Sequence, residues 1–164
     1  MSTLTQTLAR LEREEELLQF EHFSNDDAWT LGTMLVENAR KMKACPAFQI
    51  TVNGYTVFRY GFPGTNLHNE RWLARKRNTT ETTHMSSLRA GTLLQINGEN
   101  IARDWYLPEE DFAVLGGGFP LTLKGTGVIG SVCCSGLPHE TDHQIVADTI
   151  AQFLHISLEQ KTEV

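Results

Sequence analysis

Residues 139–143, His-Glu-Thr-Asp-His, come nearest in type and spacing to a catalytic motif. Two histidines at this spacing share one helix face, and the glutamate between them can activate a metal-bound water, as in zinc proteases. Pro138 directly precedes the run, so we expect these residues to open a helix rather than to lie inside one. Asp142 would add a charge at a position buried beside the metal, and the spacing to His155 fits no common third ligand.

A helix start is therefore the favoured interpretation of this run. Glu140 and Asp142 would lie at the positive end of the helix dipole, which stabilises carboxylates. We expect no metal site here. Two alternatives stay open: a metal-dependent hydrolase built on His139, Glu140 and His143, and a surface metal site formed by the two histidines alone.

A basic segment is the second candidate for chemistry. Arg71 and Arg75 share one face of a predicted helix, and Trp72 and Lys76 share the neighbouring face. A cationic cluster in an acidic protein can hold a carboxylate or a phosphate. The alternative, which we favour for one basic run taken alone, is a solvated surface or ion pairs with the acidic N-terminal helix.

The glycine triplet 116–118 could bring backbone N–H groups close to an anion. The segment lacks the Gly-x-Gly-x-x-Gly pattern, and no Lys-Ser or Lys-Thr follows as a P-loop requires. A tight entry into a strand is the simpler interpretation. The sequence also has no Gly-x-Ser-x-Gly elbow, which argues against an α/β-hydrolase nucleophile.

The composition is that of one globular domain. The chain has 164 residues, a net charge of −6, 40% hydrophobic residues and 21% charged residues. An acidic balance disfavours nucleic-acid binding, because neutralising phosphates needs a cationic face. No run is long enough to span a membrane, and the N-terminus lacks a signal-peptide core. An odd number of cysteines (Cys45, Cys133 and Cys134) favours the cytoplasm.

Hydrophobic spacing predicts helices and strands in an order typical of an α+β fold. Asn53-Gly54 joins two alternating runs and predicts a β-hairpin. Residues 79–83 contain four threonines and are poor helix formers, so the third helix should end before them. We expect helices at 4–20, from 25 to before 46, at 69–78, at 88–96 and after 138, and strands at 48–52, 55–60, 119–123 and 128–134.

Several motifs together resemble one protein family. The segments Gly-Gly-Gly-Phe-Pro-Leu-Thr-Leu (116–123), Gly-Val-Ile-Gly-Ser-Val-Cys-Cys-Ser-Gly (127–136) and an acidic helix start at Asp142 are similar to GlcG/HbpS-like proteins, also known as the haem-degrading-domain family. Residues 52–54, 63–65, 69–79, 86–87 and 136–143 resemble its uncharacterised-protein branch. The resemblance covers about residues 20–156, nearly the whole chain.

This resemblance implies a profilin-like α+β fold with a five-stranded antiparallel sheet and helices on both faces. The whole chain, 1–164, would be a single such domain with residues 1–20 as an N-terminal helical extension. It also implies homo-oligomers and, in some members, haem binding. The positions that match the family's motifs, and so could line a shared pocket or a subunit contact, are Asn69, Trp72, Arg75, Lys76, Gly117, Gly118, Asp142 and His143.

The resulting hypothesis is a cytoplasmic, oligomeric protein that binds a small anionic ligand and interacts with neither nucleic acid nor membrane. The cofactor is unknown, with haem implied by resemblance alone, and whether a reaction is catalysed stays open. The alternative is a structural or accessory oligomer with no ligand. The hypothesis requires the basic segment and the glycine triplet to converge when the sheet folds.

Overall fold

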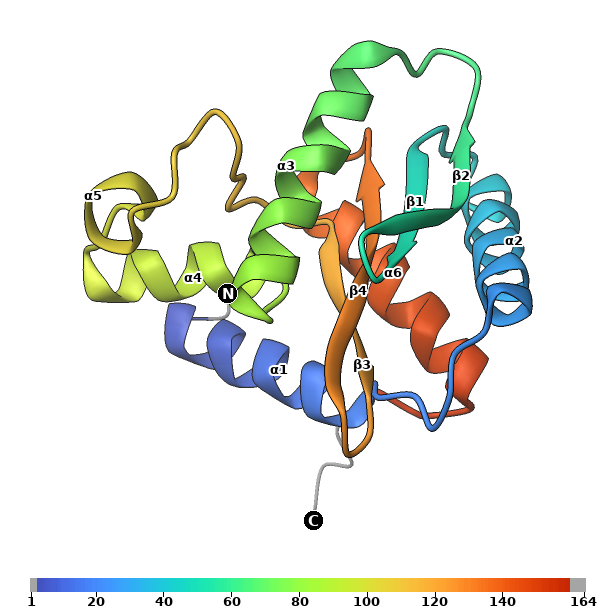
Figure 1. Cartoon of the computed structure of the whole chain (residues 1–164), viewed down its shortest axis with the longest axis horizontal. Helices are drawn as coiled ribbons and strands as arrows, with labels where there is room; N and C mark the ends of the chain where they lie inside the picture. The colour runs from blue at the N-terminus through green and yellow to red at the C-terminus, as the bar shows by residue number, and fades with distance from the viewer. Residues whose placement is uncertain (1–2, 160–164) are drawn as a thin grey trace.

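The structure is a computed structural model that describes residues 3–159 (Figure 1). The prediction of a single domain over 1–164 extends beyond these residues at both ends. Within the described residues, no helix is both long enough and apolar enough to cross a membrane. The elements are α1 (Leu4–Leu17), α2 (Asn25–Lys41), β1 (Ala47–Val52), β2 (Tyr55–Gly61), α3 (Leu67–Thr83), α4 (Ser87–Asn97), α5 (Ile101–Trp105), β3 (Gly118–Leu123), β4 (Gly127–Ser135) and α6 (His139–Leu154).

The α+β class and the antiparallel sheet are confirmed, but the predicted number of five strands is wrong. The described residues form four strands in the order β2-β1-β4-β3. Phe20 makes an isolated bridge outside β3, donating its N–H to the Thr122 carbonyl at 2.8 Å and accepting from Lys124 N at 2.9 Å. Between α1 and α2, in residues 18–24, the pairing with β3 is a single bridge at Phe20, so this connection does not form a fifth strand.

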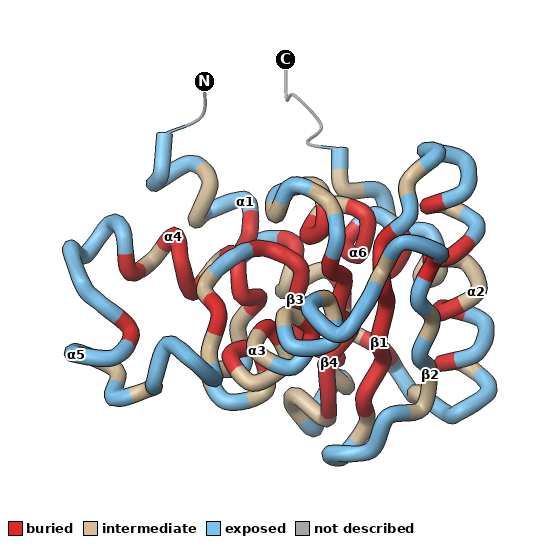
Figure 2. Tube along the Cα trace, turned by 90° about the horizontal axis from the view of Figure 1, so that it is seen from above, coloured by how far each residue is buried: buried red, intermediate tan, exposed pale blue. Residues whose placement is uncertain are grey.

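The two faces of the sheet bury different chemistry. Helices α2 and α6 cover one face, where Phe48, Ile50, Val132 and Cys134 form part of the apolar core. Helix α3 crosses the other face, where a small cluster of Ala47, Leu73 and Cys133 lies among polar residues (Figures 1 and 2). The vicinal cysteines therefore point to opposite faces, as strand alternation predicts.

Two local predictions had different outcomes. The hairpin is confirmed, with positive φ angles of 50° at Asn53 and 78° at Gly54. The predicted end of the third helix before residue 79 is wrong, because α3 continues to Thr83. Thr79 and Thr80 are fully buried, and the Thr79 hydroxyl donates to the Arg75 carbonyl at 3.2 Å. Burial against the sheet therefore overrides the weak helix propensity of threonine.

Helix α1 is fixed to the domain by its acidic residues. Arg89 of α4 bridges Glu12 and Glu15, each at 3.2 Å. The expected ion pairs between this helix and the basic run 71–77 are wrong, because α4 lies beside α1 and α3 does not (Figure 1). Burial raises the pKa of Glu15 to about 7, against the opposing effect of Arg89. The contact thus includes a carboxylate that is costly to ionise.

Candidate functional site

The predicted site residues divide between two places that meet along α3. Lys76 and Asp142 form the centre of the first place, a buried cluster in which their side chains are only 3% and 2% exposed. Lys76 Nζ lies 2.9 Å from Asp142 Oδ2 and donates to the Cys134 carbonyl, also at 2.9 Å. A buried pair of this kind is stable only when both charges are compensated, as they are here.

Two of the predicted glycines lie against this pair. A Cβ on Gly117, whose φ is 131°, would lie 2.4 Å from the Cys134 carbonyl oxygen and 2.7 Å from Lys76 Nζ. A Cβ on Gly118 would lie 2.5 Å from the Thr80 hydroxyl oxygen. The entry to β3 therefore approaches α3 so closely that only glycine fits. The structure brings Lys76, Gly117, Gly118 and Asp142 together.

Asp142 is the hub of the cluster. Its Oδ1 accepts from Leu137 N at 3.0 Å and from the Cys134 thiol at 3.2 Å. Burial raises the pKa of Asp142, while Lys76 opposes that rise. Burial also raises the pKa of Cys134 well above that of a free thiol, so this cysteine is a hydrogen-bond donor and not a nucleophile. The cluster holds together β4, α3 and the start of α6.

The histidines of the 139–143 run also have structural partners. Helix α6 begins at His139, as predicted from Pro138. His139 Nδ1 accepts from Gly116 N at 3.1 Å, and His143 Nε2 lies 2.6 Å from Glu14 Oε2 of α1. His143 Nδ1 is buried without a hydrogen-bond partner. Among residues 3–159, no group of three or more His, Cys, Asp or Glu side chains is placed to hold a metal ion.

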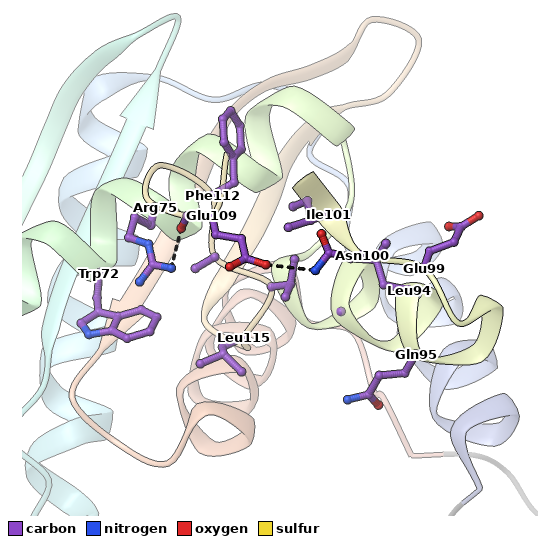
Figure 3. Close-up of a pocket in the computed structure, with 13 residues that line it drawn as sticks. Trp72, Arg75, Leu94, Gln95, Glu99, Asn100, Ile101, Glu109, Phe112 and Leu115 are labelled. Carbon is purple, nitrogen blue, oxygen red and sulfur yellow. Dashed lines mark hydrogen bonds between the residues drawn. The ribbon is translucent and has the colours of Figure 1, made fainter. Parts of the chain in front are cut away.

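The second place is a groove on the far side of α3, where Trp72 and Arg75 lie (Figure 3). The Arg75 guanidinium stacks on the Trp72 ring, 4.4 Å from its centroid. Its Nη2 donates to the Glu109 carbonyl at 2.7 Å, while its Nε is buried without a partner. Arg75 therefore has a buried donor, Nε, that no protein atom satisfies.

An apolar cavity opens beside Arg75. It has a volume of about 300 Å³ and lies between α3, α4, α5 and the segment that leads to β3 (Figure 3). The Glu109 carboxylate lies at its edge and accepts from Asn100 Nδ2 at 3.0 Å. Apolar side chains dominate the lining, with polar groups at the rim. The main lining residues are Leu94, Gln95, Glu99, Asn100, Ile101, Phe112, Ala113, Val114 and Leu115.

A second cavity, lined by more charged residues, adjoins the first. Its volume is about 550 Å³, and Trp72, Arg75 and Glu109 line both cavities. Arg71 lines only the second, together with His68, Ala74, Asn78, Glu110 and Asp111. Arg75 and Glu109 thus form the wall between an apolar chamber and a charged one. This arrangement suits a ligand with an apolar body and a polar end.

Asn69 lies in neither cavity. Its Oδ1 accepts from Asn66 N at 3.0 Å, as part of the cap of α3. The predicted set also misses the groove's other wall, which comes from Glu109, Phe112 and Leu115. Residues 105–111 lie between the predicted helix at 88–96 and the predicted strand at 119–123, where the sequence predicts no helix or strand. Nothing in their spacing indicates that this loop returns to α3, more than thirty residues earlier in the chain.

Comparisons with known proteins agree with the fold. The family described as "Haem degrading protein HbpS-like" matches residues 23–151. UPF0303 protein YE1367 of Yersinia enterocolitica is 40% identical over 151 residues, covering 92% of this chain and 90% of that protein. A UPF0303 protein of Yersinia pseudotuberculosis is 39% identical over 155 residues, covering 94% and 91%.

Solved structures extend the comparison. The crystal structure of Ybr137w protein superposes with a TM-score of 0.84 at 25% identity, over 93% of this chain and 90% of that one. The crystal structure of a PduOC:heme complex superposes with a TM-score of 0.67 at 23% identity, over 84% and 99%. The latter similarity shows the fold alone. From the family match and the relatives at 40% identity, the chain belongs to the HbpS-like family of haem degrading proteins, among relatives that carry the UPF0303 name.

Proposed function

We propose that this protein binds a small anionic ligand of the haem class in the groove between Trp72 and Leu115. Two comparisons support haem as the ligand: the family is described as haem degrading, and the similar PduOC structure is a complex with heme. The observation that carries it is the unsatisfied Arg75 Nε beside an apolar cavity. A buried donor without a partner costs roughly 1–3 kcal/mol, which an acceptor on a ligand would offset.

The residues of the groove fit such a ligand. A porphyrin needs an apolar slot for its macrocycle, which Phe112 and Leu115 help to line. Its carboxylates need cations, which Arg71 and Arg75 supply. His68 is the imidazole at the groove, and its Nε2 accepts from Trp72 Nε1 at 3.1 Å. Bound haem would supply an iron centre, and His68 would ligate it only by releasing the Trp72 N–H from its Nε2 lone pair.

A hemin titration followed by Soret absorbance tests the proposal. We expect a saturable band shift at micromolar hemin for the wild-type protein. Gln95→Trp should weaken binding at least tenfold, because Gln95 lies on the exposed surface of α4 and lines the apolar cavity. Ile96→Trp is the matched control, because Ile96 is the exposed neighbour and does not line it. The absence of saturation in the wild type, or equal binding by both variants, would contradict this site.

A second candidate function is the accessory oligomer, which a different surface favours. Trp29 and Tyr55 are 66% and 71% exposed beside β2, an edge strand of the described sheet. A cavity of about 390 Å³ lies there, between Trp29, Phe58 and Tyr60. Exposed aromatics and an open edge are typical of protein contacts. Light scattering of Trp29→Ser should show a smaller particle than the wild type; equal particle sizes would count against an assembly through this surface.

The proposed compartment is the cytoplasm. Cys45, Cys133 and Cys134 are all free in the structure, as is usual for proteins kept in a reducing environment. Fractionation of cells that produce the protein should recover it with cytoplasmic markers, and recovery with an extracytoplasmic fraction would contradict the assignment.

A further inference from the structure

Arg75 presents an incomplete binding edge to the groove. The Nε and Nη2 atoms of an arginine lie on the same edge of the planar guanidinium, and a carboxylate binds that edge through two parallel hydrogen bonds. In this structure Nη2 donates to the Glu109 carbonyl at 2.7 Å, and Nε has no partner. A carbonyl presents one oxygen where the edge has two donors. The edge is therefore half filled.

The surroundings keep this edge in place and leave the protein no carboxylate to complete it. The Trp72 ring supports the plane of the guanidinium at 4.4 Å. The Glu109 carboxylate is directed away, because it accepts from Asn100 Nδ2 at 3.0 Å. Arg71, on the same face of the helix, lines only the second cavity. Arg75 is thus a fixed cation whose remaining donor lies at the boundary between two cavities.

The two cavities are separated by a hydrogen bond between Arg75 and Glu109 that is easily broken. The bond from Arg75 Nη2 to the Glu109 carbonyl is solvent-exposed, and residues 108–111 are exposed along their whole length. Water can replace the partners of an exposed side chain–backbone bond, so opening it costs little free energy. The loop keeps two other ties to α3, from Ala113 N to the Arg75 carbonyl at 3.2 Å and from Asn78 Nδ2 to the Asp111 carbonyl at 2.9 Å. The wall can therefore open while the loop stays attached.

We propose that the ligand's carboxylate replaces the Glu109 carbonyl on Arg75 and occupies both Nε and Nη2, which joins the two cavities. The inference rests on the proposed function and specifies its ligand class as an amphipathic carboxylate. The apolar cavity alone, at about 300 Å³, is at the lower limit for a small-molecule site. Joined to its neighbour of about 550 Å³, it accepts the apolar body while the carboxylate stays at Arg75.

The test compares two probes that differ only in their carboxylates: protoporphyrin IX and its dimethyl ester, followed by porphyrin fluorescence in the same co-solvent. Without iron, neither probe relies on His68. We expect the wild-type protein to bind the diacid at least tenfold more tightly than the ester. Arg75→Lys keeps the positive charge but loses the two-donor edge, and should reduce this preference to below about threefold.

One control variant and three binding outcomes separate the possible explanations. Arg13→Gln removes an exposed arginine on α1, far from the groove, and should keep the full preference. Equal affinities of the two probes for the wild type, or an unchanged preference in Arg75→Lys, would overturn the exchange at Arg75 and leave the proposed function standing. Failure of both probes and of hemin to bind would overturn both. The wild-type comparison needs no variant, so it is decisive even if Arg75→Lys folds poorly.

Discussion

Arg75 and Lys76 are neighbours in the chain and carry the same charge, yet α3 directs them to opposite environments. Lys76 points into the protein, where Asp142 and the Cys134 carbonyl lie within 2.9 Å of its Nζ. Arg75 points into the groove, where one donor meets a carbonyl and another meets nothing. Burial and the satisfaction of donors, rather than charge, distinguish the structural cation from the one we assign to a ligand.

The largest loss of stability should follow the removal of the structural cation, Lys76. Lys76→Met should lower the free energy of unfolding by about 3–5 kcal/mol, because it leaves the Asp142 carboxylate buried without its partner. Urea unfolding measures the loss. The double variant Lys76→Met/Asp142→Leu removes both charges and should recover more than half of it. A single variant as stable as the wild type would show that the pair is not a structural centre.

The glycine entry to β3 is the next feature to perturb. Gly117→Ala should destabilise the fold by roughly 2–4 kcal/mol, because a Cβ there meets both the Cys134 carbonyl and Lys76 at a φ of 131°. Gly125→Ala is the matched control: its φ of 75° is also positive, but nothing lies within 4 Å of the added atom. That variant should lose only about 1 kcal/mol. Equal losses in the two variants would mean that the close approach to α3 has no energetic weight.

Glu15 lies in the contact between α1 and α4, where burial makes ionisation of its carboxyl group unfavourable. Its pKa is raised from 4.5 to about 7 in the folded protein, so between these pH values the folded state holds a proton that the unfolded state has lost. Unfolding free energy therefore falls as pH rises through this window, and the penalty is complete above pH 7. Glu15→Gln lacks this titration. Its stability relative to the wild type should rise by roughly 1–3 kcal/mol between pH 5 and pH 8.

Glu12→Gln is the control for that experiment, because Glu12 pairs with the same Arg89 from a position that is nearly half exposed. We expect it to change stability by less than about 1 kcal/mol. Denaturant unfolding at both pH values gives the comparison. A Glu15→Gln curve parallel to that of the wild type would contradict the raised pKa.

The smallest stability effect should come from the ligand-facing cation. Arg75→Gln should change the free energy of unfolding by less than about 1 kcal/mol, since it loses an exposed bond to the Glu109 carbonyl but also removes the buried Nε that has no partner. Thermal melting without ligand measures this. A loss comparable to that of Lys76→Met would remove the distinction between the two cations and make Arg75 a structural residue.

Local signals in the sequence predict most of the elements but only part of the site. The Asn53-Gly54 hairpin, the start of α6 after Pro138 and the opposite directions of Cys133 and Cys134 all follow from short-range chemistry. The length of α3 does not, because Thr79 and Thr80 become helical through burial against a sheet formed by distant strands. The fifth strand was expected from the resemblance, and the connection between α1 and α2 pairs with β3 only through the single bridge at Phe20.

The candidate site, too, was predicted from the sequence only in part. The closeness of Lys76 to the glycines agrees with the convergence that the hypothesis requires, since a Gly117 Cβ would lie 2.7 Å from Lys76 Nζ. The basic residues nevertheless separate, because successive positions on a helix face different directions. The wall contributed by Glu109 and Phe112 depends on where a loop returns in space. Periodicity and capping carry no information about that return.

Hydrogen exchange with and without hemin tests the central claim most directly, because the protein has a rival apolar cavity between α2 and β2. If the groove is the ligand site, amides in residues 67–80 and 94–115 should exchange more slowly when hemin is bound. Residues 29–40 and 55–60, which line the rival cavity, should be unchanged. Protection confined to the α2–β2 cavity, with none at the groove, would contradict the account.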